Sequence, residues 1–406
     1  MMRYFLALLA AAGLSSCATV QRPATTSAQL EADGDTARGL YEARIDTIVE
    51  GLARRSIIRG DHALDILLLS GGGQHGAYGI GFLRGWRSRT DAPMPRFDLV
   101  TGISTGGLQA PFALLGTEAA LDQASTLYRS ATSDFAPTFD KLFWLRRTGG
   151  IVNTKRYQGM IEREMDTRMA DQLQTSFAEG RQLVIGTTDF DLGIGQIWDI
   201  GHELTATSDG LDRVQKILLA TSAIPGIFPP VMIDGHVHAD GGIVSNALAV
   251  LDFEGYRKLA ARLAALGVEQ PVTVRIWVLV NMWTHSRSVA VDPSSRSAIS
   301  QRSNVLMFWN HQLQYLAGLK DMTRAVNAEV PGLRLEMRYT AIPSEFSSEP
   351  GAADLFNGEW MTRIEQFGFE RAQSDKPWDV ITTPYARPLP VLTPTEKMQF
   401  DESVAK

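Results

Sequence analysis

The sequence has almost no cysteine, no excess of basic charge and no long apolar run. Cys17 is the single cysteine among 406 residues, so neither an internal disulfide nor a zinc site built on several cysteines can exist. The 39 Lys and Arg against 45 Asp and Glu give a net charge of −6, without the basic excess of a nucleic-acid-binding protein. No stretch reaches the about 20 apolar residues of a transmembrane helix. The 44% apolar and 21% charged residues are ordinary for a globular protein and exclude disordered, collagen-like and coiled-coil chains.

The first residues have the pattern of a secretory signal. Arg3 precedes an apolar run over residues 4–12, which is too short to span a bilayer. The run ends in Leu14-Ser15-Ser16-Cys17, which resembles the lipobox of bacterial lipoproteins. This resemblance implies cleavage before Cys17 and a membrane anchor of several acyl chains, and Ala18 after it points to the outer membrane, facing the periplasm. An ordinary signal peptide with an incidental cysteine is the alternative.

The remaining chain divides into four predicted parts. Residues 17–40 are small and polar and predict a flexible tether that begins with the acylated cysteine. Residues 41–63 carry apolar side chains at helical spacing and predict a helix. Residues 64–255 predict a catalytic domain, and residues 256–406 a C-terminal extension that completes it.

Short apolar segments alternate with helical stretches through the predicted domain and its extension. The predicted strands cover residues 64–69, 97–100, 182–185 and 272–280, with another near 335–339. Such alternation favours a largely parallel sheet with helices on both of its faces.

Residues 102–106, Gly-Ile-Ser-Thr-Gly, match the motif G-x-S-x-G between a predicted strand and a predicted helix. In a nucleophile elbow, the glycines of this motif permit a strained turn that exposes the serine hydroxyl. Ser104 is therefore a candidate nucleophile. Because the motif also occurs by chance, a glycine-rich structural turn is the alternative.

Residues 70–76, Ser-Gly-Gly-Gly-Gln-His-Gly, form a second glycine-rich loop after a strand. Exposed backbone N–H groups at the start of a helix can stabilise a developing oxyanion. The loop also fits the dinucleotide-binding pattern G-x-G-x-x-G. That alternative requires an acid at the end of the next strand, but this strand leads into Ser104 and Asp98 lies inside it. An acyl-transfer site is therefore favoured.

A third motif, Asp240-Gly241-Gly242, follows further along the chain. A glycine loop, G-x-S-x-G and D-G-[GA] in this order resemble the patatin-like phospholipases, lipid acyl hydrolases with a Ser–Asp dyad. Residues 187–193 and 220–230 also resemble the segments by which that family approaches its aspartate. The resemblance covers about residues 64–246. It implies a three-layer α/β/α sandwich with a C-terminal α+β extension, a lipid or phospholipid substrate, and no cofactor or metal.

The resemblance also implies roles for individual residues. These are Ser104 as nucleophile and Asp240 as proton acceptor, Gly71, Gly72, Gly73 and Gly76 in the oxyanion hole, Gly102 and Gly106 in the elbow, and Gly241 and Gly242 after the base. His75 stands where most members carry Arg or Lys, so any positive charge there would depend on pH. The predicted function is a membrane-anchored lipid acyl hydrolase of the phospholipase A or lysophospholipase type. A non-catalytic envelope lipoprotein that uses the same fold to bind lipid is the alternative.

Histidines leave two further alternatives open. His285 and His311 follow Asp240 in the order of a Ser-Asp-His triad, although neither has a recognisable loop context. His236, His238 and Asp240 alternate onto one strand face and could bind a metal. A structural hairpin with exposed histidines is favoured over a metal site, and a role for His238 in tuning Asp240 stays open.

An aromatic segment lies after the predicted elbow helix. Its apolar members are Phe135, Phe139, Leu142, Phe143 and Trp144, and its cations are Lys141, Arg146 and Arg147. Apolar residues flanked by cations suit contact with lipid chains and head groups. A helix packed in the core is the more common meaning of such spacing.

Overall fold

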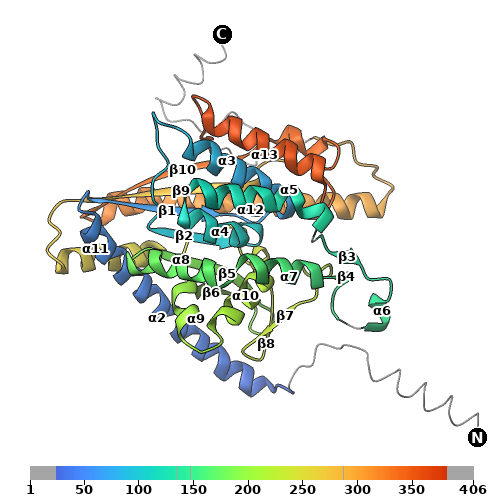
Figure 1. Cartoon of the computed structure of the whole chain (residues 1–406), viewed down its shortest axis with the longest axis horizontal. Helices are drawn as coiled ribbons and strands as arrows, with labels where there is room; N and C mark the ends of the chain where they lie inside the picture. Colours follow the sequence, from blue (N-terminus) through green and yellow to red (C-terminus); the bar gives the residue numbers. More distant parts are fainter. Residues whose placement is uncertain (1–23, 135, 147, 287, 382–406) are drawn as a thin grey trace, which may run out of the picture.

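A computed structural model describes residues 24–134, 136–146, 148–286 and 288–381 (Figure 1). Its strands are β1 (Ala63–Leu69), β2 (Leu99–Ile103), β3 (Thr138–Phe139), β4 (Val152–Asn153), β5 (Gln182–Asp189), β6 (Ile194–Asp199), β7 (Val231–Ile233), β8 (His236–Asp240), β9 (Val272–Trp283) and β10 (Leu333–Ile342). Its helices are α2 (Ser27–Arg59), α3 (Gly76–Arg87), α4 (Thr105–Leu115), α5 (Glu118–Asp134), α6 (Phe143–Arg146), α7 (Lys155–Glu164), α8 (Thr167–Ala178), α9 (Ile200–Thr205), α10 (Gly210–Thr221), α11 (Phe253–Ala265), α12 (Arg296–Glu329) and α13 (Gly358–Gln373). Short 3₁₀ turns are η1 (Gly73–His75), η2 (Gly241–Ile243) and η3 (Ser344–Ser348).

Most of the strands form one mixed sheet. Its order is β10-β9-β1-β2-β5-β8-β7, and β6 pairs with β5 in addition. The strands from β10 to β5 are paired in parallel, whereas β6, β7 and β8 are joined by antiparallel pairs. The largely parallel sheet predicted from the sequence is confirmed.

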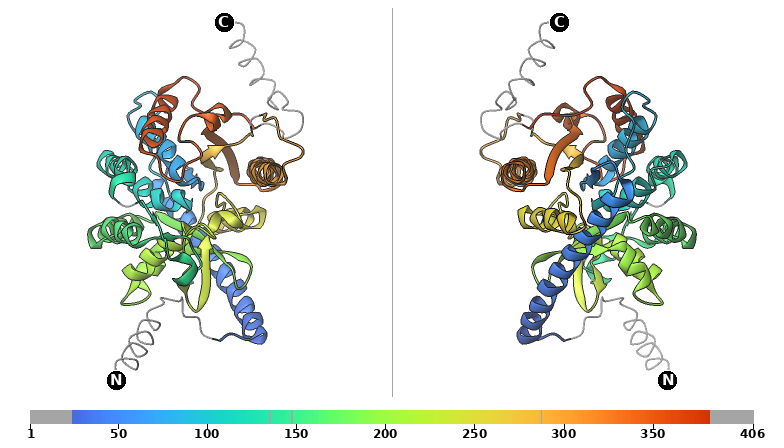
Figure 2. Two further views of the ribbon diagram at one scale, coloured as in Figure 1. Left: turned by 90° about the vertical axis from the view of Figure 1, so that its right-hand side faces the viewer. Right: turned by 90° about the vertical axis from the view of Figure 1, so that its left-hand side faces the viewer.

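Helices cover both faces of this sheet, because successive side chains of a strand point to opposite sides. In β1, Leu67 and Leu69 pack into a core with α3, α4, α5 and α13, while Ile66 and Leu68 pack into a second core with α2, α11 and α12. The left panel of Figure 2 shows these two helical layers on opposite sides of the sheet. The predicted α/β/α sandwich is therefore confirmed.

The observed strands extend the predicted ones at their carboxyl ends. The predicted strand 97–100 is β2, which ends one residue before Ser104. The predicted strand 182–185 continues to Asp189 as β5. The strands β9 and β10, which belong to the predicted C-terminal extension, join β1 in the same sheet, as expected of a segment that completes the domain.

The predicted tether is wrong from Ser27 to Leu40, whereas the predicted helix is confirmed as far as Arg59. A tether was expected over residues 17–40 and a helix over residues 41–63, but α2 runs from Ser27 to Arg59. Thr26 and Gln29 form a capping box, in which each side chain accepts a hydrogen bond from the backbone N–H of the other, and this starts the helix early. Glycines within the segment lower its helix propensity and concealed this start.

The ends of the chain lie outside the described residues. These ends are residues 1–23, with the predicted signal and Cys17, and residues 382–406. In the part of the chain that the structure describes, no helix combines the length and hydrophobicity needed to cross a lipid bilayer.

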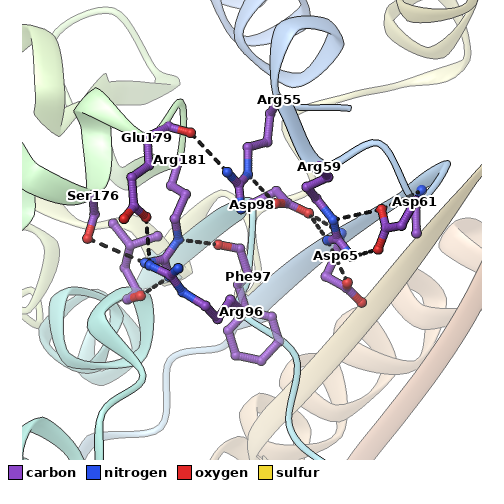
Figure 3. Close-up of polar contacts among 12 residues, drawn as sticks. Arg55, Arg59, Asp61, Asp65, Arg96, Phe97, Asp98, Ser176, Glu179 and Arg181 are labelled. Carbon is purple, nitrogen blue, oxygen red and sulfur yellow. Dashed lines mark hydrogen bonds and ion pairs between the residues drawn. The ribbon is translucent and has the colours of Figure 1, made fainter. Parts of the chain in front are cut away.

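Charged side chains are buried at the amino ends of β1 and β2 (Figure 3). Asp98, which precedes β2, accepts hydrogen bonds from Arg55 Nε (2.8 Å), from Arg59 Nη1 (2.5 Å) and from the backbone N–H of Asp65 (2.7 Å). Burial works against the charged form of Arg59, but hydrogen bonds to Asp61 and the two buried aspartates outweigh it and raise the pKa of the guanidinium. Every buried carboxylate of this network therefore has a cation beside it.

Candidate active site

Ser104 occupies a strained turn between β2 and α4. Its φ of 54° and ψ of −127° lie in a region that residues with a side chain rarely adopt. A Cβ on Gly102 would meet the backbone of Gly106, and a Cβ on Gly106 would meet the Leu69 carbonyl, so both positions require glycine. The turn has the geometry of a nucleophile elbow with Ser104 at its apex.

The pairing of β5 brings Ser104 and Asp240 together. Along one edge, β5 pairs first with β2 and then with β8. The pairing with β2 ends at Gly186, opposite Ile103, and the pairing with β8 begins at Thr187, opposite Asp240. The other edge of β5 is occupied by β6 over the same length. The ends of β2 and β8 therefore meet, and the Ser104 hydroxyl lies close enough to the Asp240 carboxylate to favour its ionised form.

The end of α10 holds the backbones on both sides of this contact. Thr221 Oγ1 accepts a hydrogen bond from the Ser104 N–H (2.9 Å) and donates one to the Gly186 carbonyl (2.5 Å). The Asp240 N–H donates to the Ala223 carbonyl two residues later (3.0 Å). One segment thus fixes the nucleophile, the shared strand and the aspartate relative to each other.

The Asp240 carboxylate is buried beside two hydrogen-bond donors and no charge. Burial raises its pKa to about 6, while hydrogen bonds from Ser104 and from the Gly242 N–H (2.8 Å) favour the ionised form. Among the described residues, no cation or histidine acts on this carboxyl. It is therefore ionised at neutral pH and can accept a proton from the serine more readily than an exposed aspartate would.

The glycine loop offers two backbone donors beside the elbow. The Gly71 N–H donates to the Asn246 carbonyl (2.8 Å), and the Gly76 N–H donates to carbonyls of its own turn. The structure gives no acceptor among the described residues to the N–H groups of Gly72 and Gly73. Of the four predicted oxyanion-hole glycines, two therefore use their N–H groups within the loop, and the N–H groups of the other two have no acceptor among the described residues.

His75, in the same loop, is enclosed by tryptophans. Its ring lies 4.8 Å from that of Trp283, and Trp360 Nε1 donates a hydrogen bond to its Nδ1 (2.9 Å). Burial lowers the pKa of His75 to about 4. The pH-dependent positive charge predicted from this residue is therefore absent at neutral pH, and its neutral ring carries the proton on Nε2.

An apolar pocket opens at Ser104. The pocket encloses about 940 Å³, part of it open to solvent, between α4, α5, α7 and α8. Apolar side chains such as Leu108, Met160 and Phe228 dominate its wall, and among the described residues Glu164 is the single charged one that lines it. A wall of this kind suits an acyl chain rather than a charged group.

Comparison with known proteins agrees with this geometry. Residues 67–251 match the family model described as patatin-like phospholipase, and this stretch contains Ser104, Asp240 and both glycine motifs. These residues form a patatin-like phospholipase domain.

Two individual proteins are similar over part of their length. The cGAMP-activated phospholipase of Pseudomonas aeruginosa (strain BWHPSA011 / Pa011) is 28% identical over 193 residues, which cover 45% of this chain and 53% of that protein. The chain thus spans about half the length of this curated relative. Among solved structures, VipD from Legionella pneumophila aligns with a TM-score of 0.34 and 12% identity, over 76% of this chain and 66% of that one.

His236, His238 and Asp240 do not form the alternative metal site. His236 Nδ1 lies 2.7 Å from Asp189 Oδ2, and buried His238 contacts Thr187 Oγ1 (3.2 Å), so the predicted exposed histidines are in fact largely enclosed. Among the described residues, the group that could hold a metal is Asp189, Asp191 and His236, not His236, His238 and Asp240. Hydrogen bonds among the end of β5, the β5–β6 turn and β8 already engage these three side chains.

The aromatic segment lies on the surface instead of in the core. The exposed fractions are 61% for Phe139, 44% for Leu142, 37% for Phe143 and 68% for Trp144. Phe135 lies outside the described residues. The core-helix interpretation is therefore wrong for the four described residues.

Several supporting residues were not found from the sequence. Thr221, Asn246, Trp283 and Trp360 hold the elbow, the glycine loop or His75, and Gln312 accepts a hydrogen bond from Asn246 Nδ2 (2.6 Å). They come from distant segments and carry no local motif, so only their packing identifies them.

Proposed function

We propose that this protein hydrolyses carboxylic esters of lipids with Ser104 as nucleophile and Asp240 as general base. The observation that supports this proposal is the buried pair of Ser104 and Asp240, of which Ser104 lines an apolar pocket. The reaction class follows from that arrangement, because the pocket orients an acyl chain while the pair attacks its carbonyl.

In the first half of the reaction, Ser104 Oγ attacks the acyl carbonyl and Asp240 accepts its proton. The N–H groups of Gly72 and Gly73 stabilise the oxyanion of the tetrahedral intermediate. When this intermediate collapses, the ester bond breaks and the proton passes from Asp240 to the leaving alcohol. The products are a free alcohol and an acyl-serine.

In the second half, Asp240 takes a proton from a water molecule, which attacks the acyl-serine. The proton returns to Ser104 Oγ as the fatty acid leaves, so the pair is restored. Cleavage of a phospholipid or lysophospholipid acyl ester is the proposed activity. We propose that acylated Cys17 anchors the protein to the periplasmic side of the outer membrane.

An active-site-directed fluorophosphonate tests the nucleophile. The reagent should label the unmodified protein and should not label Ser104→Ala. Product analysis on mixed envelope lipids should then show a fatty acid released by the unmodified protein but not by Ser104→Ala. A folded protein that neither reacts nor releases fatty acid would instead be a lipid-binding module.

The proposed anchor has a separate test. Cys17→Ser should leave the domain folded but remove it from the membrane fraction after a high-salt wash, because acyl chains supply the strong attachment. Full retention of this variant in washed membranes would contradict the anchor.

A further inference from the structure

Two exposed apolar elements are connected to the catalytic site. The first is the β3–α6–β4 hairpin, residues 138–153, where Trp144 is 68% exposed. The second is the amino-terminal half of α12, where Val305, Leu306, Met307 and Phe308 are exposed one after another. Four consecutive apolar residues on the surface of a helix are unfavourable in water unless they serve a function.

Each element is connected to the active site through different residues. In the hairpin, the N–H groups of Ile151 and Val152 donate to the carbonyl of Ile227, next to Phe228 in the pocket wall. In α12, the residue after the exposed run is Trp309, whose ring lies 5.3 Å from Trp283. Trp283 in turn packs on the glycine loop through His75. The hairpin is therefore joined to the pocket wall, and α12 is joined to the glycine loop through Trp283 and His75.

The figures place both elements on the same side of the molecule. In Figure 1 the hairpin with α6 and the amino-terminal half of α12 both project to the right. The left panel of Figure 2 views that side directly, with α12 seen end-on above the hairpin. One flat surface can therefore contact both elements at once.

The charge of the hairpin region is opposite to that of the whole chain. Residues 139–156 contain five basic residues, Lys141, Arg146, Arg147, Lys155 and Arg156, against one acidic residue, Asp140. Asp140 is itself paired with Arg146 (3.1 Å). In a chain with a net charge of −6, this local excess complements an anionic surface.

We propose that the hairpin and the amino-terminal half of α12 form a docking face for an anionic phospholipid surface. This inference rests on the proposed function, because a lipid substrate must pass from its bilayer or micelle into the pocket. Trp144 and Met307 enter the interfacial layer while Lys141 and Arg146 of the hairpin contact head groups. A docked enzyme then receives a single acyl chain without exposing it to water.

Site-specific fluorescence tests the contact directly. Cys17→Ser removes the single cysteine of the full chain, so Trp144→Cys, Met307→Cys and Ile58→Cys can each carry one environment-sensitive fluorophore. Ile58 is a matched control, because it is 60% exposed, close to the 64% of Met307, and lies at the opposite end of the molecule, on the carboxyl end of α2.

On vesicles of phosphatidylcholine and phosphatidylglycerol, the labels at positions 144 and 307 should shift to shorter wavelength, and the label at position 58 should not. Phosphatidylcholine alone should give a smaller shift at both positions. Labels that respond no more than the control, or a response at one of the two positions alone, would overturn the docking face. An equal response without phosphatidylglycerol would overturn its preference for anionic lipid.

Turnover provides a second measurement. For Trp144→Ser combined with Met307→Ser, the ratio of vesicle hydrolysis to hydrolysis of a soluble short-chain ester should fall at least about tenfold. Ile58→Ser should leave this ratio unchanged, and an unchanged ratio in the double variant would contradict the proposal. If the unmodified protein hydrolyses neither substrate, the proposed function fails, while the fluorescence experiment still decides the docking face.

Discussion

Asp98 and Asp240 lie at opposite ends of the strands of the same sheet, and both are buried. Asp98 is held by two arginines, Arg55 and Arg59, at the amino ends of the strands. Asp240 lies at the carboxyl ends beside a hydroxyl and a backbone N–H, without a cation among its described neighbours. An aspartate therefore stabilises the fold at the amino ends of the strands, and another can accept a proton at the carboxyl ends. The difference lies in the partners of the two carboxylates.

The comparison separates two influences on the carboxylate of an aspartate: its burial, and its pairing with a cation. A buried carboxylate that is paired with a cation contributes to the fold, and loss of either partner leaves the other charge buried and unpaired. A buried carboxylate without a cation destabilises the folded state and binds a proton more readily. Four measurements test this difference between Asp98 and Asp240.

The largest effect should follow the loss of the catalytic pair. Ser104→Ala and Asp240→Asn should each lower kcat by about 10⁴-fold or more, and the double variant should lose little more, because the two act as a unit. The assay is hydrolysis of a soluble ester. As controls, His285→Ala and His311→Ala should keep most activity. A folded histidine variant as inactive as Ser104→Ala would show that the site is a triad.

Loss of the paired aspartate should weaken the fold instead. Asp98→Asn leaves Arg55 without its buried carboxylate and Arg59 with Asp65 as its remaining buried one, and should lower the free energy of unfolding by about 3–5 kcal/mol, measured with urea. Asp61→Asn is the matched control: it also removes a partner of Arg59, but Asp61 is about half exposed and should cost less than about 1 kcal/mol. Equal losses for the two variants would contradict the role of burial.

Loss of the unpaired aspartate should stabilise the fold. The pKa of Asp240 rises from 3.8 to about 6 on folding, so its ionised form is disfavoured in the folded state and stability falls as pH rises through that window. At pH above 6, Asp240→Asn should therefore raise the free energy of unfolding by up to about 3 kcal/mol. The gain should vanish below about pH 4. Destabilisation at neutral pH would contradict this account.

The smallest effect should appear in the pH profile. Because protonated Asp240 cannot act as a base, kcat/KM should fall about tenfold for each pH unit below about 6. His75 is neutral over this range and should not contribute. His236→Gln, on the same hairpin as Asp240, should leave the inflection in place. An inflection near pH 4 would mean that Asp240 is not desolvated.

The sequence by itself determined the local parts of this protein. The apolar runs that became β1, β2, β5 and β9, the elbow at Ser104 and the glycine loop before α3 each depend on neighbours in the chain. Backbone conformation and strand periodicity are set over a few residues, so these features were predictable. The capping box at Thr26 was equally local, and it was missed because glycines and small polar residues suggested a tether.

Only the tertiary structure decided what these parts do together. Pairing of β2 and β8 along one edge of β5 brings Ser104 to Asp240. Tryptophans from β9 and α13 bury His75, which therefore stays neutral, and Trp144 lies on the surface. Each outcome depends on burial, charge pairing or contact between segments far apart in the chain. A pKa or an exposed fraction is a property of these surroundings, which no local pattern contains.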